Sequence, residues 1–326
     1  MKNFFGKIFL YIIIYLLFMF FIPWGTIHFF SPSSPVPETV SVKTVKTYIA
    51  SEKAVKEYPL EEYLAGVVGA EMPATFPEEA LKAQAVAART FVIYKTLSVT
   101  PDAHSGTGAP VCTDPGHCKA WKSEEALMNS WGGDTTASAE YMNKIKKAVK
   151  ETENEIITFD GKPISAVYYS MSGGKTENSA DVWGGDVPYL KSVNSSLDEK
   201  APGFSSEAAF TVDEFKKVIL AENPSATFGD NPDLWVTDVT RSEGGGVISL
   251  KIGGAEFKGT KIRTLFSLRS HNFTVEISDG LAVFKVKGYG HGVGMSQWGS
   301  KFLAEEGKTY AEILKYYYTG VEIEKL

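Results

Sequence analysis

The sequence predicts an α+β fold: a single-pass membrane anchor, then one mixed domain of helices and strands that carries an inserted lobe. Three observations lead to this class. An uncharged apolar run lies near the N-terminus, helical and strand-like segments follow without a regular βαβ alternation, and glycine-rich breaks separate the later strand-like runs. The chain has 326 residues, 44% of them hydrophobic, which is enough for a packed core.

The predicted anchor occupies residues 1–24. From Ile8 to Trp24 the sequence carries no charge, and at about 1.5 Å per helical residue it reaches roughly 25 Å, near the lower limit for crossing a bilayer. Lys2 and Lys7 precede this run, so we expect that end in the cytoplasm and the bulk of the chain outside. A cleavable signal peptide is the alternative, but the run is bulky and lacks a small-x-small cleavage site.

Residues 25–40 follow as a Pro/Ser-rich spacer, and 41–326 form the extracytoplasmic domain, with about 204–275 as the inserted lobe. The net charge of the chain is −6. An acidic exterior argues against nucleic acid as a partner, because binding phosphates requires a basic face.

Two consecutive helices are predicted after a short strand at Val40 to Ile49. The segment "PLEEYLAGVVGAEM" has apolar residues at helical spacing, and Pro73 ends this helix at about Glu71. The second helix starts at Pro77 and covers "PEEALKAQAVAARTFVIYKTL". Its first turn holds two glutamates, which the helix dipole favours there.

Glu71 has no such structural explanation. It lies at the C-terminal end of its helix, where unpaired carbonyl groups repel a carboxylate. Its apolar neighbours Ala70, Met72 and Pro73 add a desolvation cost of the same sign. Both effects favour the neutral, proton-donating form that a general acid needs near neutral pH. The alternative is a solvated side chain on a frayed last turn.

The remaining segments alternate irregularly. In chain order we expect a loop at 100–115, a helix from Ala139 to Glu155, strand-like runs at 156–170, hairpins at 235–259, and a glycine-rich turn feeding two short helices within 285–320.

Three long motifs lie in this domain: Leu60–Phe91, "YYSMSGGKTENSADVWGGDVPYL" at Tyr168–Leu190, and "GYGHGVGMSQWGS" at Gly288–Ser300. Together they resemble the stage II sporulation protein D family of bacterial cell-wall lytic transglycosylases. The resemblance implies cleavage of the β-1,4 bond between N-acetylmuramic acid and N-acetylglucosamine, which leaves a 1,6-anhydromuramoyl end. It also implies that the glutamate of "AEMP", here Glu71, is the catalytic acid/base.

One carboxyl group suffices for this reaction, because the 6-hydroxyl of the same sugar is the nucleophile. Ordinary glycosidases use two carboxylates. Glu78, Asp181 and Asp186 are candidates for a second one, and the sequence does not choose among them.

Several polar and glycine residues are candidates for substrate binding. Arg89 follows on the second helix, where it either contacts substrate, orders Glu71 or forms a surface ion pair. Glycine turns let backbone approach a sugar closely, although they also occur in plain tight turns, and polar groups on such a turn suit hydrogen bonding to sugars. A histidine on such a turn, here His291, is as often a structural residue as a substrate-binding one. The substrate-binding candidates are Arg89, Tyr169, Ser172, Gly173, Gly174, His291 and Gln297.

The two cysteines share one short loop with two histidines. His104, Cys112, His117 and Cys118 supply two imidazoles and two sulfurs, which suits a tetrahedral zinc site. Four protein ligands leave no open position, so we expect a structural zinc and no cofactor for catalysis. A disulfide between Cys112 and Cys118 is the alternative, which the extracytoplasmic location permits.

The sequence lacks the motifs of two other classes of hydrolase. There is no HExxH for a zinc peptidase and no G-x-S-x-G for a serine hydrolase. A non-catalytic wall-binding anchor or scaffold remains the alternative function. The family resemblance further implies a mother-cell membrane location facing the intermembrane space during engulfment, and peptide-free (denuded) glycan strands as substrate. It also implies partnership with the sporulation amidase, stage II protein P, and with stage II protein M.

Overall fold

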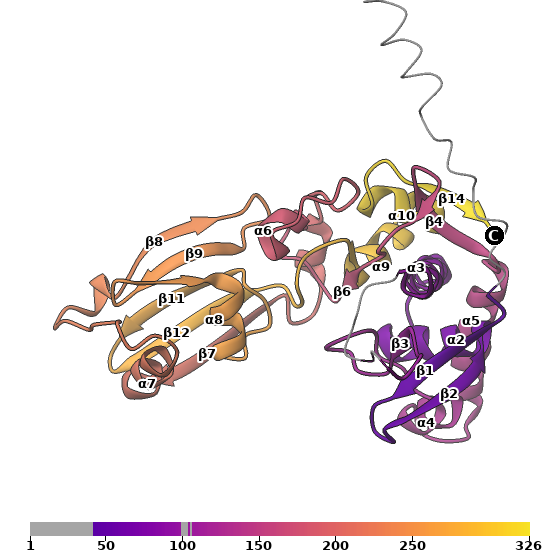
Figure 1. Cartoon of the computed structure of the whole chain (residues 1–326), viewed down its shortest axis with the longest axis horizontal. Helices are drawn as coiled ribbons and strands as arrows, with labels where there is room; N and C mark the ends of the chain where they lie inside the picture. The colour runs from indigo at the N-terminus through magenta and orange to yellow at the C-terminus, as the bar shows by residue number, and fades with distance from the viewer. Residues whose placement is uncertain (1–41, 99–103, 105) are drawn as a thin grey trace, which may run out of the picture. The chain divides into compact units, whose positions relative to one another are not determined.

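The computed structural model describes residues 42–98, 104 and 106–326, so the expected anchor and spacer lie outside the described residues. Within the described ranges, no helix is both long enough and apolar enough to cross a membrane. The α+β class is confirmed, because helices and several small sheets occur along the whole of the described chain (Figure 1).

The first hydrophobic core surrounds helix α3 (Glu78–Leu97), most of whose side chains are buried. Its many alanines allow α2, α5, α9 and α10 to pack against it. Helix α2 (Leu60–Glu71) ends at the predicted residue, because Pro73 cannot continue it and Met72 is extended. The remaining elements outside the lobe are β1 (Thr44–Ile49), β2 (Ala54–Pro59), β3 (Val111–Cys112), α4 (Glu124–Ser130), α5 (Thr136–Glu151), β4 (Glu155–Phe159), β5 (Lys162–Pro163), β6 (Tyr168–Tyr169), α6 (Ser179–Trp183), η1 (Ser196–Lys200), β13 (Met295–Ser296), α9 (Gln297–Glu305), α10 (Tyr310–Tyr317) and β14 (Glu322–Lys325).

A second core lies within residues 205–287, the region of the expected inserted lobe. Two antiparallel sheets, in the orders β10-β9-β8 and β11-β12-β7, enclose it together with α7 and α8. It extends past residue 275, because β12 pairs with both β7 and β11. Its elements are β7 (Ser205–Thr211), α7 (Val212–Glu222), η2 (Pro232–Leu234), β8 (Val236–Arg241), β9 (Val247–Ile252), β10 (Ala255–Lys258), α8 (Gly259–Leu265), β11 (Phe273–Ser278) and β12 (Leu281–Lys287).

Several boundaries differ from the expectation. Helix α5 begins at Thr136 instead of Ala139, because Thr135 and Ser138 form a capping box. It ends at Glu151, since strand β4 starts at Glu155. The glycine-rich turn near the C-terminus does feed two short helices, α9 and α10.

A short parallel ladder brings two of the sequence motifs together. Strand β13 pairs with β6, with Met295 opposite Tyr168 and Ser296 opposite Tyr169. This pairing places the start of α9 beside the motif that begins at Tyr168. The candidate site lies at this junction.

Candidate active site

Glu71 is the last residue of α2, and its carboxylate accepts two hydrogen bonds. The backbone N–H of Ala120 donates to Oε1 over 2.8 Å, and the side-chain amide of Gln297 donates to Oε2 over 3.1 Å. Glu71 remains partly exposed, so a ligand can reach the carboxyl group. Donors from two distant segments therefore fix the orientation of this side chain.

Gln297 is positioned by the N-terminus of α9. It is the first residue of that helix, and the hydroxyl of Ser296 caps the helix by accepting the N–H of Gly299 over 3.1 Å. The same hydroxyl donates to Oδ2 of Asp198 over 2.7 Å. Asp198 is fully buried, and burial raises its pKa. Sequence reasoning missed Asp198, because no local pattern connects it with residues almost a hundred positions later.

A buried lysine that the sequence analysis did not single out, Lys119, lies close to Glu71. Its side chain is 8% exposed, and Nζ lies 3.6 Å from the centroid of the Tyr168 ring and 4.7 Å from that of Phe91. Burial lowers the pKa of Lys119 to about 8, and the nearby charge of Glu71 opposes this shift. A lysine next to a cysteine carries no sequence signal of burial.

His291 lies near this lysine, among aromatic rings. Its Nδ1 accepts the N–H of Val293 over 3.1 Å, and its ring centroid is 5.3 Å from that of Tyr169 and 5.2 Å from that of Trp183. Burial, reinforced by the charge of Lys119, lowers the pKa of His291 well below its usual value. Because Nδ1 accepts the N–H of Val293, it carries no proton, and the geometry corresponds to a neutral imidazole.

The turn at Ser172 to Gly174 contacts the lobe and Asp198. The N–H of Ser172 donates to Oδ2 of Asp198 over 2.6 Å. A Cβ on Gly173 would lie 2.2 Å from Nδ2 of Asn272, and Gly174 has a φ of 113°. The group that approaches the backbone of Gly173 is thus a side chain of the lobe. A role of this turn in substrate binding stays a prediction.

The structure does not bring Arg89 to this cluster. Its guanidinium is fully buried and pairs with both carboxylate oxygens of Glu61, at 3.1 and 2.6 Å. It also donates to the backbone carbonyl oxygens of Val149, Thr152 and Glu155. These contacts tie α2, α3 and the end of α5 together, so the observed role of Arg89 is structural.

The three candidates for a second carboxylate have other partners. Glu78 and Asp186 form ion pairs with lysines, and Asp181 accepts a hydrogen bond from Asn178. In the part of the chain that the structure describes, none of the three hydrogen-bonds to Glu71. Of these four carboxylates, Glu71 is the one that Ala120 and Gln297 hold.

A cavity of about 580 Å³ lies elsewhere, beside the middle of α2. Tyr58, Trp121, Leu127 and Met142 are among its lining residues, and Glu71 is not. The candidate site is accordingly defined by the contacts of Glu71 and not by the size of a cavity.

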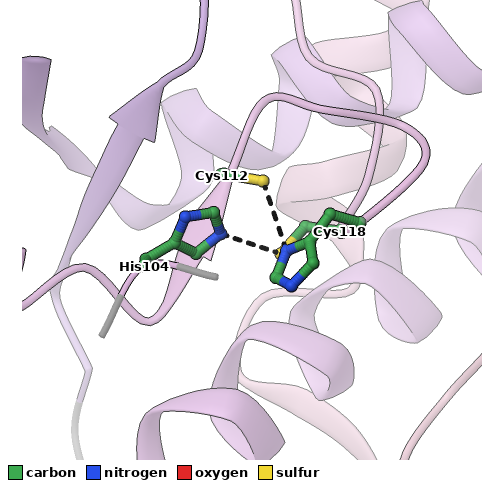
Figure 2. A group of neighbouring side chains, drawn as sticks. His104, Cys112 and Cys118 are labelled. Atoms are coloured by element: carbon green, nitrogen blue, oxygen red, sulfur yellow. Dashed lines mark hydrogen bonds between the residues drawn. The ribbon is translucent and has the colours of Figure 1, made fainter. Parts of the chain in front are cut away.

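The cysteine and histidine loop brings four ligand atoms together. His104 Nε2, Cys112 Sγ, His117 Nδ1 and Cys118 Sγ all lie within 4.8 Å of one another. Figure 2 shows His104, Cys112 and Cys118 converging. His117 Nδ1 lies 3.3 Å from Cys118 Sγ and 3.6 Å from Cys112 Sγ, and His104 Nε2 lies 3.8 Å from Cys118 Sγ. These three distances are close to the edges of a tetrahedron around a zinc with bonds of about 2.0–2.3 Å. Both cysteines are free thiols. The donor set and its spacing therefore fit zinc.

This loop leads directly into the site. Cys118 is followed by Lys119 and then by Ala120, whose N–H holds Glu71. A group bound by the four ligands would consequently stiffen the segment that positions the carboxylate.

Comparison with known proteins gives consistent matches. The family model described as Stage II sporulation protein matches residues 48–159. Stage II sporulation protein D of Bacillus amyloliquefaciens is 39% identical over 280 residues, which are 86% of this chain and 78% of that protein. Its Bacillus subtilis strain 168 counterpart is 38% identical over 295 residues, 90% and 82% of the two chains. A B. subtilis protein named amidase enhancer is 30% identical over 309 residues, which span 80% of this chain and 40% of that protein.

Proposed function

Because the chain belongs to the stage II sporulation protein D family, a family of sporulation proteins, we propose that it is a lytic transglycosylase acting on peptidoglycan during engulfment. The proposed reaction breaks the β-1,4 bond between N-acetylmuramic acid and N-acetylglucosamine in peptide-free glycan strands. The product carries a 1,6-anhydro-N-acetylmuramic acid end.

One observation carries this proposal: a partly exposed glutamate at a helix C-terminus, whose two oxygens are held by an amide side chain and a backbone N–H. A general acid must be within reach of the substrate and fixed in orientation. Glu71 meets both requirements.

The proposed mechanism uses Glu71 twice. Protonated Glu71 gives its proton to the glycosidic oxygen as the bond to the anomeric carbon breaks. The resulting carboxylate then takes the proton of the 6-hydroxyl of the muramic acid, and that oxygen bonds to the anomeric carbon. Gln297 and the N–H of Ala120 stabilise the carboxylate between the two steps. Protons balance, and no water is consumed.

Incubation of the purified full chain with peptide-free glycan strands tests the activity. We expect new 1,6-anhydro ends, detected by mass spectrometry of the released fragments. Retention of the chain on intact strands without new ends would instead identify a non-catalytic wall-binding anchor or scaffold.

We further propose that His104, Cys112, His117 and Cys118 hold a structural zinc. Zinc would cross-link the loop, and it would supply no reactive position because four protein ligands complete its coordination. Metal analysis of the purified chain should find about one zinc per chain. An intact-mass measurement showing a Cys112–Cys118 disulfide would contradict this proposal.

The setting is also a proposal. Residues 1–24 would anchor the chain in the mother-cell membrane, with residues 41–326 in the intermembrane space. The name amidase enhancer, given to a relative, supports a partnership with a wall amidase, and the family points to stage II protein P and stage II protein M. Co-purification from sporulating cells would test both partners.

A further inference from the structure

Among the described residues, Lys119 is a mostly buried lysine whose ammonium group has no hydrogen-bond or ion-pair partner. Its side chain is 8% exposed, and the contacts of Nζ are with the faces of two aromatic rings. Within the residues that the structure describes, Nζ forms no ion pair and no hydrogen bond; Glu71 and Cys118 act on it only as nearby charges. Such an ammonium group is costly unless something else supplies an acceptor.

The two rings satisfy only part of this need. A cation above Tyr168 and Phe91 gains electrostatic energy from the ring faces. The ammonium group nevertheless keeps three N–H donors, and a ring face does not replace an oxygen acceptor. The arrangement therefore leaves room for an anionic oxygen brought by a ligand.

The location of Lys119 identifies which ligand can bring that oxygen. Lys119 lies over the ring of Tyr168, and His291 lies against the ring of the next residue, Tyr169. The same two tyrosines pair with the strand that leads into Gln297, so Lys119 and His291 lie beside the segment that holds Glu71. The backbone of the following residue, Ala120, holds Glu71 directly. A substrate whose glycosidic oxygen approached Glu71 would therefore pass beside the segment that carries Lys119.

We propose that Lys119 binds the free lactyl carboxylate of N-acetylmuramic acid and thereby selects strands that lack stem peptides. This inference rests on the proposed function. In a peptide-free strand each muramic acid carries a carboxylate, which can pair with the ammonium group. In a strand that still carries stem peptides the same carbonyl is part of a neutral amide, and the charge of Lys119 remains uncompensated.

Binding measurements on a variant that we expect to be catalytically inactive test the proposal without requiring turnover. Full-length Glu71→Gln is titrated with peptide-free strands and with the same strands after chemical conversion of their lactyl carboxylates to methylamides. We expect roughly 10- to 100-fold tighter binding of the carboxylate form, from a charge-assisted hydrogen bond. Adding Lys119→Met should remove that preference and leave binding of the methylamide form within about twofold.

Two further variants control the result. Lys122→Met removes an exposed lysine three residues along the chain and should keep the preference. Lys119→Arg preserves the charge and should keep most of it. An unchanged preference in Lys119→Met, equal weakening of both ligands, or no measurable binding of either ligand to Glu71→Gln would overturn the proposal. Absence of anhydro products from the wild-type chain would separately overturn the activity, because these titrations do not depend on cleavage.

Discussion

At the scale of single residues, Glu71 is held by groups that are remote in the sequence. Ala120 follows the cysteine and histidine loop, and Gln297 opens α9 near the C-terminus. Each donates to a different oxygen of the carboxylate. The two contacts restrict rotation of the side chain, so both oxygens of the carboxyl group keep a fixed direction.

Gln297→Ala should lower kcat on peptide-free strands about 10-fold, the value of one lost hydrogen bond to a charged group. KM should change little, because the amide acts on Glu71 and not primarily on the ground-state substrate. Steady-state release of anhydro ends measures both constants. An unchanged kcat would show that this contact is not used.

At the scale of elements, the position of Gln297 depends on how α9 begins. Ser296 caps the helix, and the buried carboxylate of Asp198 holds both the Ser296 hydroxyl and the Ser172 N–H. Asp198 comes from η1. Two segments thus donate to one carboxylate that a third segment carries, and this sets the start of α9 relative to β6.

Asp198→Ala should destabilise the fold by about 1–3 kcal/mol, because it leaves two buried donors without an acceptor. Asp198→Asn keeps one acceptor oxygen and should lose less stability than Asp198→Ala. Urea unfolding of the two variants measures the difference. Equal stability of Asp198→Ala and the wild type would contradict this role.

The lobe is joined to the rest of the chain by a buried Glu177 and His271 pair. The N–H of Gly246 donates to Oε1 of Glu177 over 2.9 Å, and His271 Nε2 lies 3.7 Å from the same oxygen. Burial raises the pKa of Glu177 and lowers that of His271 to about 4. Arg263 adds to the lowering for His271, and Asp181 opposes it.

This pair predicts a pH dependence of stability. His271 binds a proton more readily in the unfolded chain, near its ordinary pKa of 6.5, than in the folded one. Its contribution is therefore complete above pH 6.5 and is lost as the pH falls towards 4, by roughly 3 kcal/mol. The stability contribution of Glu177 changes with pH in the opposite direction. Burial raises its pKa, so its ionisation as the pH rises disfavours the folded chain.

Unfolding free energies of His271→Asn and of the wild type, measured between pH 7 and 4, should converge as the pH falls. Circular dichroism with urea is a sufficient measurement. Parallel curves over this range would contradict the assignment of a neutral His271.

At the scale of the whole molecule, the class of fold and the main helices of the first core could be predicted from the sequence. Pro73 and Pro77 mark the boundary between α2 and α3, and local rules are enough to read it. The gathering of two cysteines and two histidines also follows from their proximity in the chain. The helices of the lobe and its extension to Lys287 could not be predicted from the sequence. The extension depends on the pairing of β12 with β7, which lie far apart in the chain.

The site could be predicted only in part, for a related reason. Glu71 is marked by its place at a helix end, whereas the partners of Arg89 and the burial of Lys119 depend on tertiary packing. An arginine beside acidic residues suggests a surface or a ligand contact. Its full burial against Glu61 and backbone carbonyls is visible only in the folded chain.

Removal of the proposed zinc should affect the site through the chain itself. Treatment with a chelator should lower the melting temperature and reduce kcat, because the loop that ends in Ala120 loses its cross-link. Thermal melts with and without added zinc measure this effect. Melting that is indifferent to chelator and zinc would speak against a structural metal.

The most direct test of the account is a comparison of Glu71→Gln with Glu78→Gln on peptide-free glycan strands. Glu78 lies only seven residues away and forms ion pairs with lysines, so it serves as a matched acidic control. We predict that Glu71→Gln remains folded and loses at least about 100-fold in release of 1,6-anhydro ends, the contribution of a general acid. Glu78→Gln should retain the wild-type rate. Undiminished release by Glu71→Gln would contradict the central claim.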